Sequence, residues 1–234
     1  MQLVATDRWK QAWPGALVGV IGLRHVVNPE RDAALQAYGA EVESQLRARF
    51  SGADRSALAA TPALRAYADY YRRFDKTYHV RLQLESVAFK GKPITGSSAL
   101  VLAMFVAELK NMLLTAVHDL GAVRGGLTVD AATGTESYQR LNGEEQVLKP
   151  GDMFIRDEDG ILSSIVYGPD WRTRITPPTN SVIFTVYAPA GISRVELEAH
   201  LADLESTVRL FSPDAVVDTR EVLFASQGNI AGRG

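Results

Sequence analysis

The stretch SSALVLAMFVAELKNMLLTAVHDLGAVRGGLTVD, from Ser97 to Asp130, decides how the rest of the chain is interpreted. Its apolar part predicts one long buried helix, which a turn at Gly125 and Gly126 separates from the start of a strand. Polar residues interrupt the helix at steps of three or four, namely Glu108, Asn111, Thr115 and His118 with Asp119. Such steps place side chains on one helical face. The row could form the floor of a ligand site or a satisfied network in the core, and both interpretations stay open.

Composition limits the possible classes of protein. The 234 residues are 46% hydrophobic, which suffices for one core, so we expect a single domain over residues 1–234 with a loose tail at 225–234. Charged residues make up 22% of the chain and the net charge is −2, so only a local patch could bind nucleic acid. The absence of cysteine excludes disulfides, thiolate metal sites and cysteine nucleophiles.

The sequence predicts a cytoplasmic protein without a membrane segment. Residues Met1 to Lys10 lack the basic start and apolar stretch of a signal peptide. The longest purely apolar run, Ala99 to Ala107, is too short to span a bilayer, and Glu108 and Lys110 interrupt its continuation.

The flanking segments predict a mixed α/β fold. Upstream, a buried strand over 16–26 precedes helices over 31–49, 63–73 and 76–91, and Asn28 with Pro29 predicts the start of the first helix. Downstream, short extended runs are separated by glycine turns, including Asn142-Gly143 and Asp159-Gly160, which are hairpin signals. These runs are 127–129, 138–141, 146–148, 153–155, 161–167 and 181–187. A long helix over 191–212 and a strand over 214–223 follow. We therefore expect N-terminal helices, a mixed or antiparallel sheet and a long C-terminal helix.

No motif predicts a catalytic residue, a metal or a cofactor. His118-Asp119, with His79 upstream, is reminiscent of the metal site of helical phosphohydrolases, but strands follow it here. No Gly-x-Ser-x-Gly elbow occurs, and GAVRGG precedes a strand instead of opening a helix. Whether the protein is an enzyme stays open.

The loop GPDWRTRITPPT, residues 168–179, is more informative. It places Trp171, Arg172 and Arg174 beside three threonines. Arginines and hydroxyl groups can hold a carboxylate or a phosphate, although the same composition suits a solvated loop.

Four segments together resemble a known family. They are ELKNMLLTAVHDLGAVRGG (108–126), YQRLNGEE (138–145), KPGDMFIRDEDG (149–160) and GPDWRTRITPPTNSVIFTVYAP (168–189). They resemble the B3/4 domain of the bacterial phenylalanyl-tRNA synthetase beta subunit and, more closely, stand-alone B3/4 proteins, over about Leu64 to Phe224. The resemblance implies a mixed α/β domain. In the synthetase that domain houses an editing pocket, which hydrolyses mischarged tyrosyl-tRNA.

Some family positions are matched and others are not. Asn111, Gly121, Gly125-Gly126, Asp157 and Thr179 fall where the family pattern has the same kinds of residue. The positions of the editing histidine and glutamate hold Gly125 and Thr185. Without those polar partners the pocket should not discriminate tyrosine, so we do not expect tyrosine editing.

We therefore expect a pocket between the helix, the glycine turn and the sheet. The leading interpretation is a stand-alone domain that binds tRNA or the aminoacyl end of aminoacyl-tRNA, with hydrolysis of a mischarged ester in trans as an open possibility. The alternatives are a binding module or enzyme for a small amino-acid-like metabolite without nucleic acid, and a domain that only contacts a protein partner. The predicted substrate-binding residues are Asn111, Thr115, Arg124, Gly125, Gly126, Asp157, Arg172, Arg174, Thr179 and Thr185.

Overall fold

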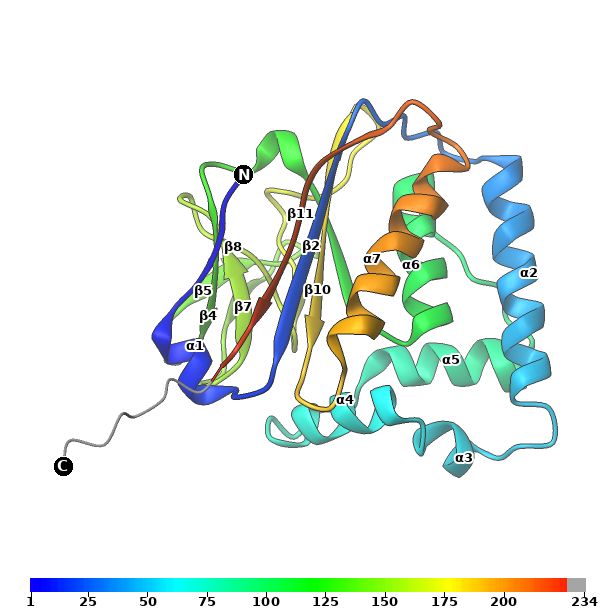
Figure 1. The fold of residues 1–234 in the computed structure, drawn as a ribbon, viewed down its shortest axis with the longest axis horizontal. Helices are drawn as coiled ribbons and strands as arrows, with labels where there is room; N and C mark the ends of the chain where they lie inside the picture. Colours follow the sequence, from blue (N-terminus) through cyan, green and yellow to red (C-terminus); the bar gives the residue numbers. More distant parts are fainter. Residues whose placement is uncertain (227–234) are drawn as a thin grey trace.

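A computed structural model describes residues 1–226 and arranges them in layers, with a second sheet on one side of a central sheet and helices on the other (Figure 1). The central sheet is antiparallel and has the strand order β11-β2-β10-β3. Its strands are β2 (Leu17–Arg24), β3 (Thr115–Asp119), β10 (Ser181–Ala188) and β11 (Val216–Phe224). β2 and β10 lie inside the sheet and are buried along almost their whole length, which matches their continuous apolar sequences. β3 is an edge strand.

The second sheet has the order β1-β4-β7-β8-β9, and only its β1–β4 pair is parallel. Its strands are β1 (Leu3–Ala5), β4 (Leu127–Ala131), β7 (Met153–Arg156), β8 (Ile161–Ser164) and β9 (Gly168–Pro169). A separate hairpin is formed by β5 (Ser137–Gln139) and β6 (Glu145–Val147). A short 3-10 turn, η1 (Leu120–Ala122), follows β3. The chain thus reaches the second sheet directly from the edge of the first.

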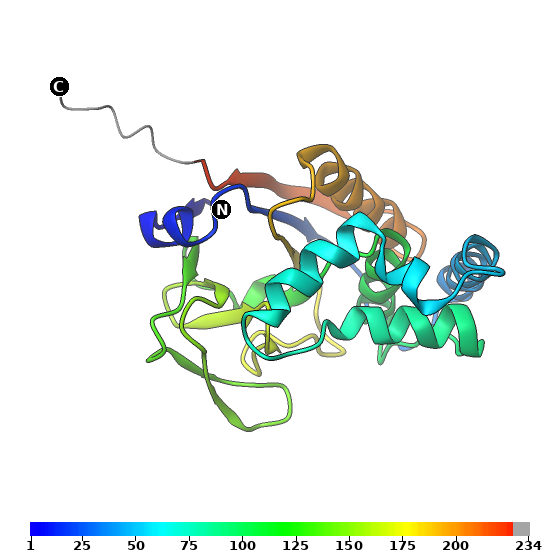
Figure 2. The ribbon, with the colours of Figure 1, turned by 90° about the horizontal axis from the view of Figure 1, so that it is seen from below.

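The helices cover the other face of the central sheet. α7 (Arg194–Arg209) packs on β2 and on α6 (Ala99–Asn111), and α2 (Ala33–Arg49) covers α6 from outside. α3 (Arg55–Ala59), α4 (Pro62–Arg72) and α5 (His79–Lys90) run beneath the layers, as the view from below shows (Figure 2). α1 (Asp7–Ala12) lies beside β4. In the described part of the chain, no helix is long and apolar enough to cross a membrane.

The predicted polar row on one helical face is wrong. α6 ends at Asn111, and Met112 adopts a left-handed backbone with φ of 61°, which turns the chain into β3. Thr115 and His118 therefore lie on a strand. Because neighbouring side chains of a strand point to opposite faces, Thr115 faces α7 whereas His118 faces the second sheet. Apolar residues occur on both sides of Met112, and a mainly apolar sequence suits a buried helix and a buried strand equally, so its period could not reveal this boundary.

The mixed α/β fold is confirmed, and most boundaries fall near their expected positions. Asn28 does not cap the first long helix, because Asp32 does so. Instead the Asn28 Oδ1 atom accepts the Leu100 N–H at 3.1 Å and so caps α6 from a distant part of the chain. The extended run expected over 161–167 is shorter, since β8 ends at Ser164. Of the predicted tail, Ala225 is buried and bonded to Ala16, and residues 227–234 lie outside the described part.

The capping box of α7 gives a test of this helical layer. The Ser193 hydroxyl accepts the Glu196 N–H, and the Glu196 carboxylate accepts the Ser193 N–H. Ser193→Ala should lower the free energy of unfolding by about 1 kcal/mol, measured by urea denaturation. Ser206→Ala on the same helix is the control, because Ser206 is exposed and its hydroxyl bonds only to the Ala202 carbonyl. An equal loss in both variants would contradict the assigned cap.

Candidate functional site

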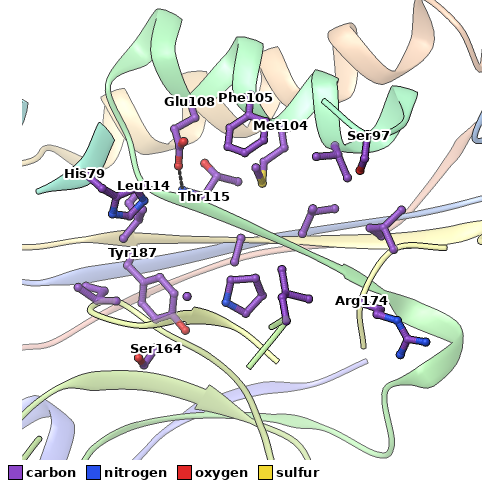
Figure 3. Close-up of a pocket in the computed structure, with 18 of the residues that line it drawn as sticks. His79, Ser97, Met104, Phe105, Glu108, Leu114, Thr115, Ser164, Arg174 and Tyr187 are labelled. Atoms are coloured by element: carbon purple, nitrogen blue, oxygen red, sulfur yellow. Dashed lines mark hydrogen bonds between the residues drawn. The ribbon is translucent and has the colours of Figure 1, made fainter. Parts of the chain in front are cut away.

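A cavity of about 460 Å³ opens where the central sheet ends at β3 (Figure 3). α6 and α5 form one wall, β3 crosses the cavity, and the segment from Ser164 to Ile175 forms the opposite wall. Most of the lining is apolar, with Met104, Phe105 and Ile165 among its larger side chains. Four lining residues carry ionisable groups: His79, Glu108, Arg174 and Tyr187. The cavity therefore combines apolar walls with a few polar groups, as ligand sites commonly do.

Glu108 is a buried acid in the wall of this cavity. Only 1% of the residue is exposed, and its Oε1 atom accepts the Thr115 N–H at 2.9 Å. Figure 3 shows its side chain pointing from α6 toward β3. Burial raises the pKa of Glu108 from 4.5 to about 8, because a charged carboxylate is poorly solvated there. At neutral pH the group is therefore mainly protonated.

β3 exposes part of its backbone to the cavity. The Tyr187 N–H bonds to the Leu114 carbonyl at 3.2 Å, and antiparallel pairs alternate along a strand. The N–H groups of Thr115, Val117 and Asp119 therefore point away from β10, toward the free edge of the sheet. Glu108 accepts the first of these, and the Thr173 carbonyl accepts the third at 2.7 Å. Between them, the backbone N–H and carbonyl of Val117 face the cavity that Val117 lines.

An aromatic residue and an arginine stand at the mouth of the cavity. The Arg174 guanidinium lies 3.7 Å from the centre of the Trp171 ring, and its Nη1 atom donates to the Trp171 carbonyl. Trp171 is 41% exposed, which is unusual for so large an apolar side chain. Figure 3 places Arg174 at the end of the cavity opposite Glu108. The site thus has an acidic end inside and a basic, aromatic end outside.

Of the predicted binding residues, Thr115 and Arg174 line the cavity. Asn111 faces α7 instead, where its Nδ2 atom lies 2.8 Å from Asp203 Oδ2 and 3.0 Å from His200 Nδ1. The His200 Nε2 atom in turn lies 2.8 Å from the Thr115 hydroxyl. Burial lowers the pKa of His200 to about 3, so this histidine is neutral. Asn111 therefore belongs to a network behind the cavity wall.

A second group of predicted residues holds a turn of the second sheet. Arg172 forms two hydrogen bonds to the Asp157 carboxylate, at 2.8 and 3.0 Å, and Asp157 also accepts the Arg124 N–H. The Arg124 guanidinium bonds to nearby backbone carbonyls. Gly125 has φ of +68°, and neither it nor Gly126 borders the cavity. The glycine turn is therefore not part of the cavity wall that we expected it to form.

The last two predicted residues are buried near β3. Thr179 donates to the Asp119 carboxylate at 2.7 Å and thereby fixes the end of the strand. The Thr185 hydroxyl is buried in β10 and has no hydrogen-bond partner. The roles of all these residues in binding stay predictions. The list of predicted binding residues did not include Glu108, Val117 and Trp171, although the sequence placed Glu108 in the polar row and Trp171 in the aromatic and basic loop.

His118 serves a structural network between the two sheets. Its Nδ1 atom lies 2.8 Å from the Thr173 hydroxyl, and its Nε2 atom lies 3.2 Å from the Ser163 hydroxyl. Burial lowers its pKa to about 3. Within residues 1–226, no group of three or more histidine, cysteine, aspartate or glutamate residues could hold a metal ion.

Comparison with known proteins gives a partial match. No family model matches the chain. Phenylalanine–tRNA ligase beta subunits from Mycoplasma pneumoniae and Mycoplasma genitalium are 30% and 29% identical to it over 69 residues, which is 30% of this chain. The chain spans 9% of the length of each of these relatives. The resemblance to the beta subunit is thus confirmed at the level of sequence similarity in one segment.

One similar solved structure is an N-terminal fragment of the phenylalanyl-tRNA synthetase beta-subunit from Pyrococcus horikoshii. It superposes on this chain with a TM-score of 0.48 and 12% sequence identity. The alignment covers 94% of this chain and 53% of that fragment.

The raised pKa of Glu108 predicts a pH-dependent stability. Between pH 4.5 and about 8 the folded chain keeps a proton that the unfolded chain loses, so the free energy of unfolding falls as pH rises through this window. Glu108→Gln cannot ionise. As pH rises from 4.5 to about 8, the free energy of unfolding of Glu108→Gln should therefore rise by several kcal/mol relative to that of the unaltered chain, measured by urea unfolding.

Two features ensure that this comparison reports on Glu108 alone. Burial raises the pKa of Asp152 to about 7, so Asp152 also makes the stability depend on pH, but equally in both proteins, and its effect cancels in the difference. Glu41→Gln, at an exposed position of α2, reports the effect of losing a surface carboxylate. A stability difference between Glu108→Gln and the unaltered chain that stays constant with pH would show that Glu108 is ionised in the folded protein.

Proposed function

We propose that the chain binds the aminoacylated 3′ end of a tRNA, with the aminoacyl group in the cavity and the terminal nucleoside at its mouth. The observation that carries this proposal is the exposed Trp171 ring, with Arg174 stacked on it, beside a mainly apolar cavity. The similarity of a 69-residue segment to phenylalanine–tRNA ligase beta subunits supports a partner of this class.

The cavity suits the aminoacyl part of such a ligand. Its volume of about 460 Å³ falls within the range of small-molecule sites. Side chains such as Val101, Met104 and Phe105 offer apolar contact to an amino-acid side chain. Gly125 and Thr185 leave the expected positions of the editing histidine and glutamate without an imidazole or a carboxylate, so the proposal does not include tyrosine editing.

The mouth suits the nucleotide part. Single-stranded RNA ends are commonly bound by stacking of bases on aromatic side chains and on arginine, with further attraction of phosphates to positive charge. Trp171 supplies an exposed ring and Arg174 a guanidinium next to it. Because the net charge of the chain is −2, binding would depend on such local contacts rather than on a general positive field.

Filter binding with charged and uncharged tRNA tests this proposal. Affinity should fall between about 50 and 200 mM salt, because phosphate contacts release counterions. Trp171→Ala should weaken binding about tenfold at either salt concentration, since it removes a stacking surface. Arg174→Ala should weaken binding and reduce the salt slope by about one.

Matched control variants lie on α7, which contributes no residue to the lining of the cavity. Arg194→Ala removes an exposed arginine that is paired with Glu198, and Val195→Ala trims a side chain that is 75% exposed. Both should bind like the unaltered chain. If the chain shows no salt-dependent binding to any of the tRNAs, the proposal is refuted. Release of the amino acid from mischarged tRNA, followed in the same samples, tests hydrolysis in trans separately.

A second candidate function is binding of a small amino-acid-like metabolite without nucleic acid. The near-neutral net charge of −2 and the apolar lining of the cavity favour it. A thermal-shift screen of amino acids and related acids should then show a higher melting temperature with a specific ligand, by mass action. A screen without any shift would count against this candidate and leave the first one standing.

A further inference from the structure

We propose that the ligand docks along the free edge of β3, with its ammonium group paired with Glu108 and its acyl carbonyl on the Val117 N–H. This inference rests on the proposed function and specifies which groups of the ligand the cavity recognises. The observations that carry it are a buried carboxyl group with a free oxygen, an unused backbone N–H beside it, and an arginine at the opposite end of the cavity.

The Glu108 carboxyl group has one oxygen, Oε2, that can still accept a hydrogen bond. Its Oε1 atom accepts the Thr115 N–H, and within residues 1–226 no side chain or backbone group donates a hydrogen bond to Oε2. The cavity that Glu108 lines lies directly beside this group. A cation that enters the cavity would therefore meet a carboxyl oxygen that the fold itself leaves unpaired.

The titratable groups around Glu108 supply no counter-charge. They are His79 at the start of α5, Tyr78 before it, Tyr67 and Tyr71 on α4, and Tyr187 on β10. Burial raises the pKa of each of these tyrosines, so they stay neutral. His79 is exposed as a residue, but desolvation of its ring lowers its pKa, so it is mainly neutral at pH 7. A ligand ammonium group would be the first positive charge beside Glu108.

The edge of β3 offers the next contact. Thr115 and Val117 are two residues apart, so their N–H groups are separated by about 7 Å along the strand. Glu108 occupies the first of these positions. An ammonium group bonded to Glu108 would place the neighbouring acyl carbonyl of an α-amino acid near the second, where the Val117 N–H has no partner within the sheet. One α-amino acyl unit can therefore use both groups.

The charges of the cavity distinguish two kinds of ligand. Glu108 and Arg174 lie at opposite ends of the cavity (Figure 3). The cavity follows α6 from Val101 to Glu108, which is about 10 Å along the helix axis. A free amino acid carries its ammonium and carboxylate on one carbon and cannot reach both ends. In an aminoacyl nucleotide, the ribose separates the ammonium group from the phosphate. The arrangement therefore favours an aminoacyl nucleotide over the free amino acid.

Binding should release a proton. In the free protein Glu108 is mainly protonated at neutral pH, because burial raises its pKa to about 8. When a ligand ammonium group arrives, the carboxyl group loses its proton to solvent and the resulting carboxylate pairs with the ammonium. No covalent bond forms or breaks in the ligand. The balance is one proton released for each ligand bound.

Isothermal titration calorimetry with a pair of matched ligands tests this inference. The first is a non-hydrolysable 3′-aminoacylamino derivative of adenosine 5′-phosphate with a phenylalanyl group, and the second is its N-acetylated twin. At about pH 6.5, where the amine is protonated, titrations in two buffers of different ionisation enthalpy count the protons released. We expect about one proton for the amine and none for the twin. The twin should bind at least about tenfold more weakly.

Glu108→Gln provides the matched variant. It keeps an oxygen for the Thr115 N–H but cannot carry a negative charge. Both ligands should bind to it with equal affinity and without proton release. The comparison of the two ligands on the unaltered chain remains decisive even where this variant folds poorly.

The outcomes separate this inference from the proposed function. Equal affinity of both ligands for the unaltered chain, without proton release, would overturn the pairing of Glu108 with an ammonium group and leave aminoacyl-end binding intact. Binding of neither ligand, together with no salt-dependent binding of charged tRNA, would refute the proposed function itself. Preference for the free amino acid over both nucleotides would overturn the inferred ligand class.

Discussion

The hydrogen bond from the Thr115 N–H to the Glu108 carboxyl group joins the helical layer to the edge of the central sheet. It closes the sharp reversal at Met112, where a residue with a left-handed backbone sends the chain from α6 back along β3. Both residues are buried, so the Thr115 N–H and the Glu108 Oε1 atom depend on each other for a hydrogen-bond partner. The position of β3 against α6, and with it the shape of the cavity, follows from this junction.

The parts of the fold that local sequence patterns govern could be predicted. The apolar sequence over 191–212 predicted the helix that the structure has as α7, and the glycine turns marked the strands of the second sheet. The boundary at Met112 could not be predicted, because no glycine or proline signals it and the apolar sequence continues on both sides. Asn28 shows the same limit, since its side chain caps α6, which begins only at Ala99.

The candidate site was predictable only in part, for a related reason. Thr115 and Arg174 were chosen by residue type, and both line the cavity. Arg172 and Asp157 have the same chemical character, but they satisfy each other in a turn of the second sheet. Which polar groups pair internally depends on contacts between distant segments. Val117 contributes through its backbone, which no side-chain pattern can reveal.

An open sheet edge is also a hazard, because its free N–H and carbonyl groups can pair with a strand of another molecule. In this chain α6 and the segment from Ser164 to Ile175 form the walls of the cavity along the edge of β3, so a strand of another molecule would meet these walls before the edge. The same walls that shape the cavity thus protect the protein from aggregation. Loop 168–175 consequently cannot be shortened freely, since a wider mouth would expose the edge to other chains.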